Sequence, residues 1–570
     1  MQQATQRTVS LFPYQDFRLT KIDYQKIITQ SEPWIDTYFR PDKSSILDPS
    51  IPTPGRLKEW ETFTWKRPKD VYGKGNYDLY KTIGPSDIRQ GACGDCYFLS
   101  SIASLAENPD RVKAIFINKE INKAGCYAMN MYVNGEPQVI VVDDYFPFNE
   151  RKNDWAFSRS SQEKELWVLL LEKAWAKIHG SYQRIEAGTT GEALPALTGA
   201  PSDFFYHSEA KNKEDVWNKI KEADQKNQII ATAVSSQRQG KSSSEMQSVG
   251  LVDAHAYSLI STHEVQDNAG KTIRLLKIRN PWGFKEWTGD WSDKSTKWTQ
   301  DIKDELGFED KDDGVFYISF DDYLNFFYIT TICKYVQDND LTVMPDEHAQ
   351  NEYCIQKIVV HKDQLSLISI MVSQLHARIA DLQMKGQYRY APLKLILMKN
   401  VQTTGTSQNE PASDQLIFID GAYICYQHAH IQLPKLTQGD YYVIFKADWL
   451  NDFHQERKLV MSIYAPDPFK IEKVSSQSFS YEFLGEIEDM LSNRIDEGFQ
   501  YQLPEYDVDG IEEYNREQRK GIQALCIKEQ VNIFQQSLQF FIVIYPYYNF
   551  KIILDQSKQI LKMDSTKKQV

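Results

Sequence analysis

Several features are scarce in this chain of 570 residues, and each scarcity excludes a class of protein. It has only seven cysteines, so the dense disulfide framework of a small secreted domain is excluded and a reducing compartment is favoured. The longest apolar runs, such as residues 540–548, are much shorter than the roughly 20 residues that a membrane-spanning helix needs. The N-terminal residues lack the apolar segment of a signal peptide. We therefore expect a soluble, cytoplasmic protein with no transmembrane segment.

Clustered positive charge and internal repeats are missing as well. The net charge is −13, and no block of Lys and Arg with interleaved aromatic residues occurs, which argues against a nucleic-acid partner. A negatively charged chain accommodates cations, including calcium, more easily. No fixed-period repeat is found, which excludes solenoids and propellers. The length predicts roughly three or four domains, because single hydrophobic cores rarely grow beyond ~250 residues.

The spacing of apolar residues predicts helices in the first part of the chain and strands after it. A helix is expected to begin at Cys96, because Asp95 suits the N-cap position and apolar residues follow at helical spacing. A second helix is expected over residues 163–178, ended by Gly180. The pattern changes near Pro201, which marks a predicted domain boundary. Beyond it, a helix near 213–226 precedes strand-like runs at 228–234, 255–262, 273–280 and 314–320.

From about residue 351, strand-like runs separated by turn-rich links predict an antiparallel β-sandwich that ends near Val474. These runs cover residues 353–361, 393–399, 415–427, 440–447 and 458–465. The final segment, 475–570, mixes an acidic, Gln-rich helical stretch with a strand-like run, and the sequence predicts no fold for it.

Two cysteines, Cys93 and Cys96, have the spacing C-x-x-C just before the first predicted helix. This spacing is typical of redox pairs, but those normally follow the first strand of a small βαβ domain, whereas a polar, Gly-rich segment precedes this pair. A zinc site needs two more ligands at compatible spacing, and the other cysteines are isolated. The third interpretation takes Cys96 alone as a nucleophile, because a helix N-terminus favours the thiolate.

Cysteine catalysis also needs a histidine that takes the thiol proton and a group that orients the imidazole. Of the ten histidines, His255 begins an apolar, strand-like run and is flanked by small residues. Asn280 ends another such run before Pro-Trp-Gly, so it is the expected orienting group, and Trp282 is expected to shield their hydrogen bond. Gln90 and the backbone N–H of Cys96 are the expected oxyanion donors. Each residue alone is also typical of a structural role, and their joint occurrence in this order favours catalysis.

Four long segments resemble the calpain family of papain-like cysteine proteases. DIRQGACGDCYFLSSIASLA resembles the active-site cysteine segment of that family, and GLVDAHAYSL resembles its histidine segment. ELWVLLLEKAWAKIHGSY resembles its Leu-Leu-Glu-Lys-Ala helix, and LLKIRNPWGFKEWTGDWSD resembles its asparagine segment. The resemblance implies Cys96 as nucleophile, His255 as general base and acid, Asn280 as orienting residue, Gln90 in the oxyanion hole and Trp282 as the shielding indole.

The resemblance implies an α+β fold, with a papain-like protease core of two subdomains, an all-β calpain-type β-sandwich and an unclassified C-terminal region. The predicted divisions are a lead-in at 1–34, a cysteine subdomain at 35–201, a histidine and asparagine subdomain at 202–338, the sandwich at 345–474 and the extension at 475–570. Tyr97 stands where the family usually has Trp, and Cys93 where it usually has Leu. Neither departure removes a catalytic group.

The resemblance also implies two calcium ions, one bound to each subdomain, that align the two halves of the core. Asp87 and Glu165 match the carboxylate ligands of the first site, together with backbone carbonyls near Tyr80 and Thr82. Calcium prefers such sets of oxygen ligands. The first site is therefore expected to be intact, although such acids are also typical of an ordinary solvated surface.

For the second calcium site, Glu286, Asp293 and Asp313 match the family's ligands, but Val315 replaces a carboxylate. This site is expected to bind calcium more weakly. No EF-hand is recognisable, because residues 505–516 resemble such a loop but have Arg516 where a bidentate Glu is needed. We therefore expect no EF-hand small subunit as a partner.

From the resemblance we expect a calcium-dependent, cytoplasmic cysteine endopeptidase, a hydrolase that cuts protein substrates at a limited number of positions. The sandwich and the C-terminal extension are expected to contact cytoskeletal or membrane-associated proteins. The alternative is a calpain-fold scaffold or interaction subunit with little or no protease activity, because a complete set of catalytic residues does not require that the cleft closes.

Overall fold

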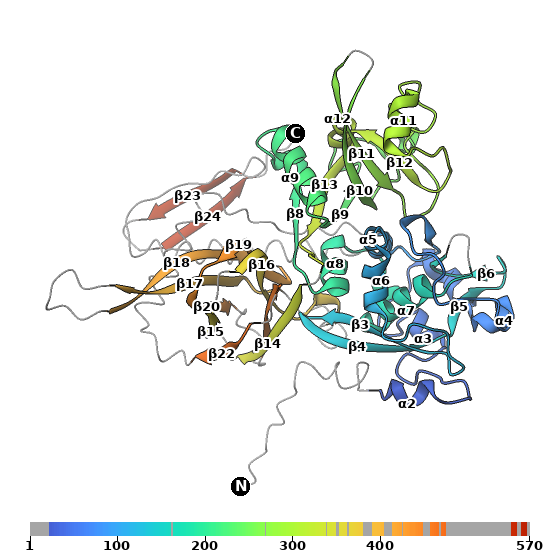
Figure 1. The fold of residues 1–570 in the computed structure, drawn as a ribbon, viewed down its shortest axis with the longest axis horizontal. Coiled ribbons are helices and arrows are strands. Elements are labelled where there is room, and N and C mark those ends of the chain that lie inside the picture. The colour runs from blue at the N-terminus through green and yellow to red at the C-terminus, as the bar shows by residue number, and fades with distance from the viewer. Residues whose placement is uncertain are drawn as a thin grey trace, which may run out of the picture. The chain divides into compact units, whose positions relative to one another are not determined.

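Figure 1 shows the fold of the chain in a computed structural model. The structure describes residues 22–160, 164–267, 270–337, 339–348, 353–361, 364–379, 390–403, 413–424, 426–448, 457–466, 469–474, 549–555 and 560–566. The chain divides into two compact units, residues 1–506 and 507–570. In the second unit, the described residues form an antiparallel hairpin of β23 (Asn549–Asp555) and β24 (Ile560–Thr566). None of the helices among the described residues is long and apolar enough to cross a membrane.

The part of the first unit before Pro201, called here the Cys region, is built around two buried helices. In α5 (Cys96–Leu105) every residue after the first is buried, and in α7 (Trp167–His179) every residue is buried. The rings of Phe98 and Trp175 stack between the two helices, with their centroids 5.1 Å apart. The remaining elements are α2 (Tyr24–Ile28), α3 (Lys43–Ile46), α4 (Pro68–Tyr72), α6 (Pro109–Ile115), α8 (Thr190–Thr198), β1 (Thr64–Lys66), β2 (Ile88–Arg89), β3 (Cys126–Val133), β4 (Glu136–Asp143), β5 (Phe146–Asn149), β6 (Asp154–Trp155) and β7 (Arg159–Ser160).

The helix expected over residues 163–178 starts later than predicted, at Trp167, and ends as predicted at Gly180, whose φ is 107°. Glu165 lies outside the helix, in a β-bridge with Asp78. Its carboxylate accepts hydrogen bonds from the backbone N–H groups of residues 81 and 82. These tertiary hydrogen bonds outweigh the local helix propensity of the sequence around Glu165.

An antiparallel sheet of six strands forms the core of the second part, called here the His/Asn region (residues 202–337). The strand order is β12-β11-β10-β9-β13-β8. The strands are β8 (Ser202–Tyr206), β9 (Ile229–Val234), β10 (His255–Gln266), β11 (Thr272–Arg279), β12 (Val315–Ser319) and β13 (Phe327–Cys333). The helices of this region are α9 (Lys213–Gln225), α10 (Ser243–Ser248), α11 (Gln300–Leu306) and α12 (Phe320–Phe326).

The pairing of β10 with β11 brings the two predicted catalytic residues of this region to one edge of the sheet. The strands are antiparallel, with Ser258 opposite Arg279. His255 is the first residue of β10, and Asn280 directly follows β11. The sheet therefore positions both side chains by its own ladder of hydrogen bonds.

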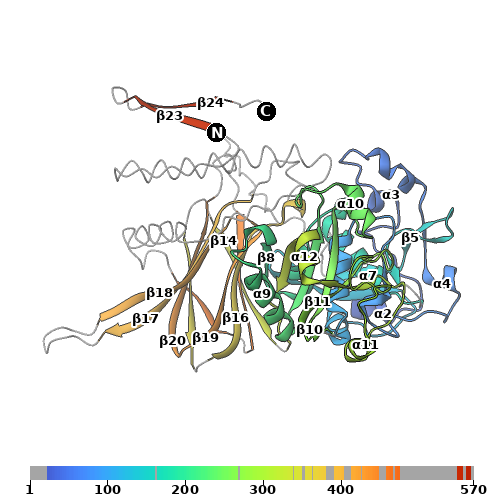
Figure 2. The ribbon, with the colours of Figure 1, turned by 90° about the horizontal axis from the view of Figure 1, so that it is seen from above.

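The two-sheet region, residues 340–474, contains two antiparallel sheets that share one hydrophobic core, and Figure 2 shows their strands side by side. One sheet has the order β14-β21-β16-β19, and the other has the order β18-β17-β20-β15-β22. The strands are β14 (Asp340–His348), β15 (Cys354–Val360), β16 (Gln364–Ser373), β17 (Leu393–Thr403), β18 (Ser413–Ile424), β19 (His428–Leu436), β20 (Gly439–Ala447), β21 (Arg457–Ala465) and β22 (Ile471–Val474). The sequence predicted β15, β17, β18, β20 and β21, and missed the other four.

Candidate active site

The imidazole of His255 and the carboxamide of Asn280 are hydrogen-bonded to each other. His255 Nε2 lies 2.8 Å from Asn280 Oδ1, and both residues are buried. Because a carboxamide oxygen only accepts, Nε2 must carry the proton in this hydrogen bond. The other ring nitrogen, Nδ1, is then left with the lone pair that accepts a proton from a nucleophile.

Asn280 is itself held by four further backbone contacts. Its Nδ2 donates to the carbonyls of Phe284 (3.0 Å) and Lys285 (2.9 Å). Its Oδ1 accepts from the N–H of Trp282 at 3.0 Å, and its own N–H donates to the carbonyl of Gly314 at 2.8 Å. Lys285 adopts a φ of +60°, which wraps this loop around the carboxamide. The orientation of Asn280 is therefore fixed on both sides of the amide.

Trp282 packs against His255, with ring centroids 5.1 Å apart. Tyr257 contacts the imidazole at 5.0 Å. Burial lowers the pKa of His255 to about 4, the Asn280 hydrogen bond opposes this shift, and the charge of Lys285 adds to it. At neutral pH the imidazole is therefore uncharged, which is the form that a general base requires.

Cys96 begins α5 and is partly exposed, whereas the rest of the helix is buried. The helix packs across to the His/Asn region, because Ser258 Oγ donates to the carbonyl of Ser100 and Ser104 Oγ donates to that of Ile230, both at 2.8 Å. The backbone of Ala256, the residue after His255, lies close enough to the thiol to affect its pKa. Burial nevertheless raises the pKa of the Cys96 thiol to about 11. In this arrangement the thiol and the imidazole are both neutral at pH 7.

Gln90 lies where the two regions meet. Its backbone N–H donates to the carbonyl of Pro281 at 3.1 Å, and its Nε2 donates to the carbonyl of Cys93 at 2.7 Å. The amide that is predicted to serve the oxyanion is thus close to the start of α5, with one of its two Nε2 hydrogens used to hold the loop.

Cys93 does not have the surroundings of a redox thiol. It is 1% exposed, and its Sγ donates to the carbonyl of Tyr182 at 3.7 Å. Burial raises the pKa of this thiol well above its usual value, and the nearby carboxylate of Asp95 adds to the shift. A neutral, buried thiol is a poor partner for thiol–disulfide exchange.

Both carboxylates of the first predicted calcium site interact with other groups of the protein. Glu165 is 1% exposed, and its oxygens accept from the N–H of Thr82 at 2.7 Å, from Ser160 Oγ at 3.4 Å and from Trp167 Nε1 at 3.3 Å. Asp87 ends a short 3-10 turn before β2 and lies close enough to interact with the charge of Arg279. Hydrogen-bond donors therefore stabilise the charge of Glu165, and the positive charge of Arg279 offsets that of Asp87.

The second set shows stronger mutual repulsion. Burial raises the pKa of Glu286 to about 7, and Asp293 and Asp313 contribute further. Burial likewise raises the pKa of Asp293 to about 6, with further contributions from Asp310 and Asp313. Carboxylates whose charges repel one another in this way suit a divalent cation. Among the residues that the structure describes, no three His, Cys, Asp or Glu side chains form a complete set of metal ligands.

Two buried charged groups beside the site were missed by sequence reasoning. Arg279 is fully buried, donates to the carbonyl of Ile88 at 2.6 Å, and interacts with Asp87 and Asp313, so it lies between both predicted calcium sites. Asp95 was expected to cap α5, but its side chain makes no cap and instead interacts with Glu172 of α7. The available signal for Arg279 was a charged residue at the end of a strand-like run.

The geometry defines a class of protein before any comparison is made. A cysteine at the start of a helix, and a histidine that an asparagine orients on the strand against which this helix packs, are typical of a thiol hydrolase. A family model described as "Calpain family cysteine protease" matches residues 34–334, which is more than half of the chain. The chain therefore belongs to the calpain family of cysteine proteases.

Curated relatives agree with this assignment. The chain is 33% identical over 312 residues to "Calpain-type cysteine protease ADL1" of Oryza sativa subsp. japonica, a match that covers 52% of this chain and 14% of the relative. It is 32% identical over 283 residues both to "Calpain-9" of Mus musculus and to "Calpain-1 catalytic subunit" of Bos taurus. Each of these two matches covers 48% of this chain and 40% or 38% of the relative. The chain thus spans less than half the length of these relatives.

Solved structures also include a similar protein. The cysteine protease and lectin-like domains of Cwp84 from Clostridium difficile match with 10% sequence identity and a TM-score of 0.16, covering 45% of this chain and 57% of that one. This similarity is too low to support a conclusion.

Proposed function

We propose that this protein is a calcium-dependent cysteine endopeptidase that cuts other proteins at a limited number of sites. The observation that carries the proposal is the His255–Asn280 pair, 2.8 Å apart, whose hydrogen-bond pattern leaves Nδ1 of the imidazole free to take a proton. Cys96 lies at the start of α5, which packs on the strand that His255 begins.

In the proposed reaction, neutral His255 takes the proton of the Cys96 thiol as the sulfur attacks a peptide carbonyl. The backbone N–H of Cys96 and the side chain of Gln90 donate to the oxyanion. The imidazolium then protonates the leaving amine, and a water deprotonated by His255 hydrolyses the thioester and releases the thiol. Asn280 keeps the imidazole in the required tautomer throughout.

Calcium is proposed to bind at Asp87 and Glu165 in the Cys region and at Glu286, Asp293 and Asp313 in the His/Asn region. The second set supports this, because burial raises the pKa of Glu286 and of Asp293 and the charges of neighbouring carboxylates add to both shifts. Bound calcium would supply positive charge to each set. Val315 adds no oxygen ligand to the second set, so the first site is proposed to bind more tightly.

The setting of the enzyme is also a proposal. We place its activity in the cytoplasm, on exposed and extended segments of protein substrates, without an EF-hand small subunit. The two-sheet region is proposed to be a calpain-type β-sandwich that, together with the C-terminal extension, contacts cytoskeletal or membrane-associated proteins. A pull-down that compares the full chain with one ending at Val474 tests the role of the extension, which should lose its partners on truncation.

The protease proposal is tested with the purified full chain, a casein substrate and millimolar calcium. Wild-type protein should cut the substrate, and chelation of calcium should stop the cutting. Cys96→Ala should be at least about 10³-fold slower. A peptide epoxide should label Cys96 only in the presence of calcium. If wild type and Cys96→Ala both leave casein uncut and the epoxide labels neither, the chain is a calpain-fold scaffold and not an active protease.

A further inference from the structure

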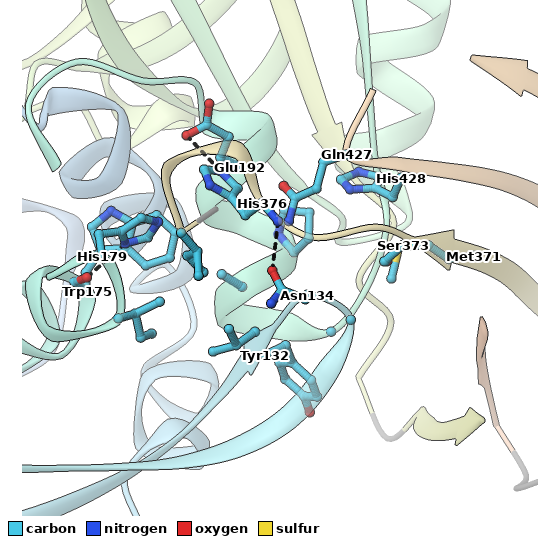
Figure 3. Close-up of a pocket in the computed structure, with 17 residues that line it drawn as sticks. Tyr132, Asn134, Trp175, His179, Glu192, Met371, Ser373, His376, Gln427 and His428 are labelled. Atoms are coloured by element: carbon cyan, nitrogen blue, oxygen red, sulfur yellow. Dashed lines mark hydrogen bonds and ion pairs between the residues drawn. The ribbon is translucent and has the colours of Figure 1, made fainter. Parts of the chain in front are cut away.

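The two-sheet region reaches into the Cys region close to the catalytic cysteine. After β16 the chain continues through residues 374–379, and Leu375 and Ile379 join the hydrophobic core of the Cys region. The backbone N–H of His376 donates to Asn134 Oδ1 at 3.0 Å, in the turn between β3 and β4. Figure 3 shows this junction, where His376 lies between side chains of both regions around a pocket.

A carboxylate of the Cys region holds this segment in place. Glu192, in α8, is 3% exposed, and its Oε2 lies 3.3 Å from Arg378 Nε and 3.4 Å from His376 Nε2. The Nδ1 of His376 accepts from the N–H of Arg378, so Nε2 carries the proton toward Glu192. A buried ion pair is favourable only if its geometry and hydrogen bonds offset the cost of removing both charges from water.

The guanidinium of Arg378 then makes three hydrogen bonds to a single loop of the Cys region. One terminal nitrogen donates to the carbonyls of Arg184 (3.1 Å) and Glu186 (3.2 Å). The other donates to the carbonyl of Ala187. The same guanidinium lies over the ring of Tyr97, 5.7 Å from its centroid, and Tyr97 is the residue after the catalytic cysteine.

The loop that Arg378 holds is the one that holds the residues before Cys96. Gly94 is bonded at both of its backbone groups. Its N–H donates to Glu186 Oε1 at 3.0 Å, and its carbonyl accepts from the N–H of Ala187 at 2.8 Å. The hydroxyl of Tyr97 also donates to the carbonyl of Ile185, at 3.1 Å. Gly94 and Tyr97 therefore flank the nucleophile and are both fixed by residues 185–187.

The backbone of this loop is in a conformation that needs outside support. Ala187 has a φ of +56°, in the left-handed region that residues other than glycine rarely adopt. Such conformations persist where the surroundings over-determine them. A Cβ added to Gly188 would lie 2.6 Å from the Tyr97 ring and 2.7 Å from a terminal nitrogen of Arg378, so these groups are closely packed. Arg378 holds the carbonyl of Ala187, and Gly94 holds its N–H.

We propose that Arg378 of the two-sheet region is a positioning residue for catalysis, which holds loop 184–188 so that this loop fixes Gly94 and the catalytic Cys96. The proposal rests on the proposed protease function. It means that the two-sheet region completes the cysteine half of the active site, so the protease core depends on it for the placement of its nucleophile.

The matched control is Lys458, which also joins the two-sheet region to the Cys region, through an ion pair with Glu136 of β4 in which the two side chains are 14% and 11% exposed. Arg378→Lys keeps a cation opposite Glu192, but an ammonium group cannot reproduce the fork of hydrogen bonds to three carbonyls. We expect kcat to fall about 10-fold or more with KM within about twofold, because a small misplacement of the nucleophile slows the chemical step. Lys458→Arg should leave kcat unchanged.

Two further readouts separate positioning from general stability. With calcium present, the rate at which iodoacetamide alkylates Cys96 should fall in Arg378→Lys and not in Lys458→Arg. In Arg378→Ala, millimolar guanidinium should raise kcat several-fold, by occupying the space of the missing group, and should leave Lys458→Ala unaffected. If Arg378→Lys matches wild type in kcat and alkylation, or if both control and test variants lose activity equally, the inference is wrong. If wild type does not cleave but Arg378→Lys slows alkylation of Cys96, the inference holds and the protease function fails.

Discussion

The two halves of the active site are built in different ways. His255 and Asn280 come from neighbouring strands of one sheet, and every polar group of the Asn280 side chain is bonded within residues 255–285. Cys96 begins a helix whose preceding loop is held by residues 186 and 187, and these are held in turn by Arg378, far along the chain. One half is fixed locally, and the other depends on a distant region.

The comparison shows that the candidate site has all its predicted side chains, and that its cysteine and histidine are nevertheless both uncharged at neutral pH. The His255 pKa of about 4 and the Cys96 pKa of about 11 describe a neutral pair, although the histidine is already oriented. If the protein is activated as we propose, activation should change the position of the cysteine relative to the histidine, since the His255–Asn280 hydrogen bond is already formed. The following predictions test this contrast, beginning with the largest expected effect.

The largest expected effect comes from removing the carboxamide of Asn280, which orients the imidazole of His255. We expect Asn280→Ala to lower kcat about 10³-fold, because the imidazole loses the bond that selects its tautomer. We also expect a loss of about 2 kcal/mol in the free energy of unfolding, from the backbone groups left without partners. The control is Asn118→Ala, whose carboxamide bonds the backbone of Cys126 and Ala128 away from the site. It should lose similar stability but no kcat, and equal losses of kcat in both would contradict the assignment.

Substitution of Gln90, which lies where the Cys region meets the His/Asn region, tests its predicted role as an oxyanion donor. We expect Gln90→Ala to lower kcat about 10²-fold, the usual effect of losing one oxyanion donor. Loss of its hydrogen bond to the Cys93 carbonyl would also loosen the loop before Cys96. Steady-state kinetics with a peptide amide check this, and a rise in KM at constant kcat would show that Gln90 binds substrate without acting on the oxyanion.

The neutral pair predicts a pH profile for the thiol. Only the thiolate reacts with iodoacetamide, so alkylation of Cys96 in calcium-free protein should rise about tenfold per pH unit from pH 7 to pH 10. His255→Ala should follow the same slope, because the neutral imidazole does not activate the thiol in this form. Rates are taken as the difference between wild type and Cys96→Ala. A plateau beginning below pH 7 would reveal a preformed thiolate–imidazolium pair and contradict the structure.

The two proposed calcium sites should differ in how strongly their carboxylates affect the calcium concentration needed for activity. We expect Glu165→Gln to raise the calcium concentration needed for half-maximal activity about tenfold, because it removes a charged ligand from the more complete site. Val315→Glu should lower that concentration by adding a carboxylate to the second site. Titration of cleavage rate against free calcium measures both. An unchanged midpoint in both variants would remove these residues from the calcium sites.

The smallest expected effect is on stability as a function of pH. The folded-state pKa values of Glu286 (about 7) and Asp293 (about 6) lie above those of ordinary carboxyl groups, so the folded chain binds more protons than the unfolded chain between about pH 4 and pH 7. Their contribution to the free energy of unfolding therefore falls as pH rises through this window. Without calcium, the double variant Glu286→Gln with Asp293→Asn should gain about 2 °C in Tm over wild type between pH 5 and pH 7.5.

The control for that measurement is Glu309→Gln, which removes a fully exposed carboxylate paired with Lys311. Its Tm difference from wild type should not grow with pH. If the double variant and the control behave alike in thermal unfolding across this range, the two carboxylates do not repel each other as the structure indicates. Added calcium should in that case have no greater effect on wild type than on the double variant.

Much of the catalytic half on the sheet was predictable from the sequence. The strand-like runs containing His255 and ending at Asn280 were expected, and they form β10 and β11. The helix start at Cys96 was also expected. These predictions rest on apolar periodicity and on motifs, which are local properties of the chain. The catalytic roles of these residues stay predictions until the kinetics are measured.

Other features could not be predicted. Helix α7 starts at Trp167 and not near residue 163, because Glu165 is used by backbone groups more than 80 residues earlier. Asp95 interacts with Glu172 in place of a cap, and four strands of the two-sheet region were missed. In each case the deciding partner is distant in sequence, so no local pattern contains it.

The sequence by itself determined the family, the order of the candidate catalytic residues and the main elements that carry them. Only the tertiary structure decided how the nucleophile is held. Arg378, an arginine with no distinguishing local pattern, meets three carbonyls about 190 residues away and a strained Ala187. Burial, which only the fold creates, moves the pKa of the thiol and of the imidazole apart. Local periodicity specifies secondary structure, whereas hydrogen-bond partners and desolvation depend on which distant segments the folded chain brings together.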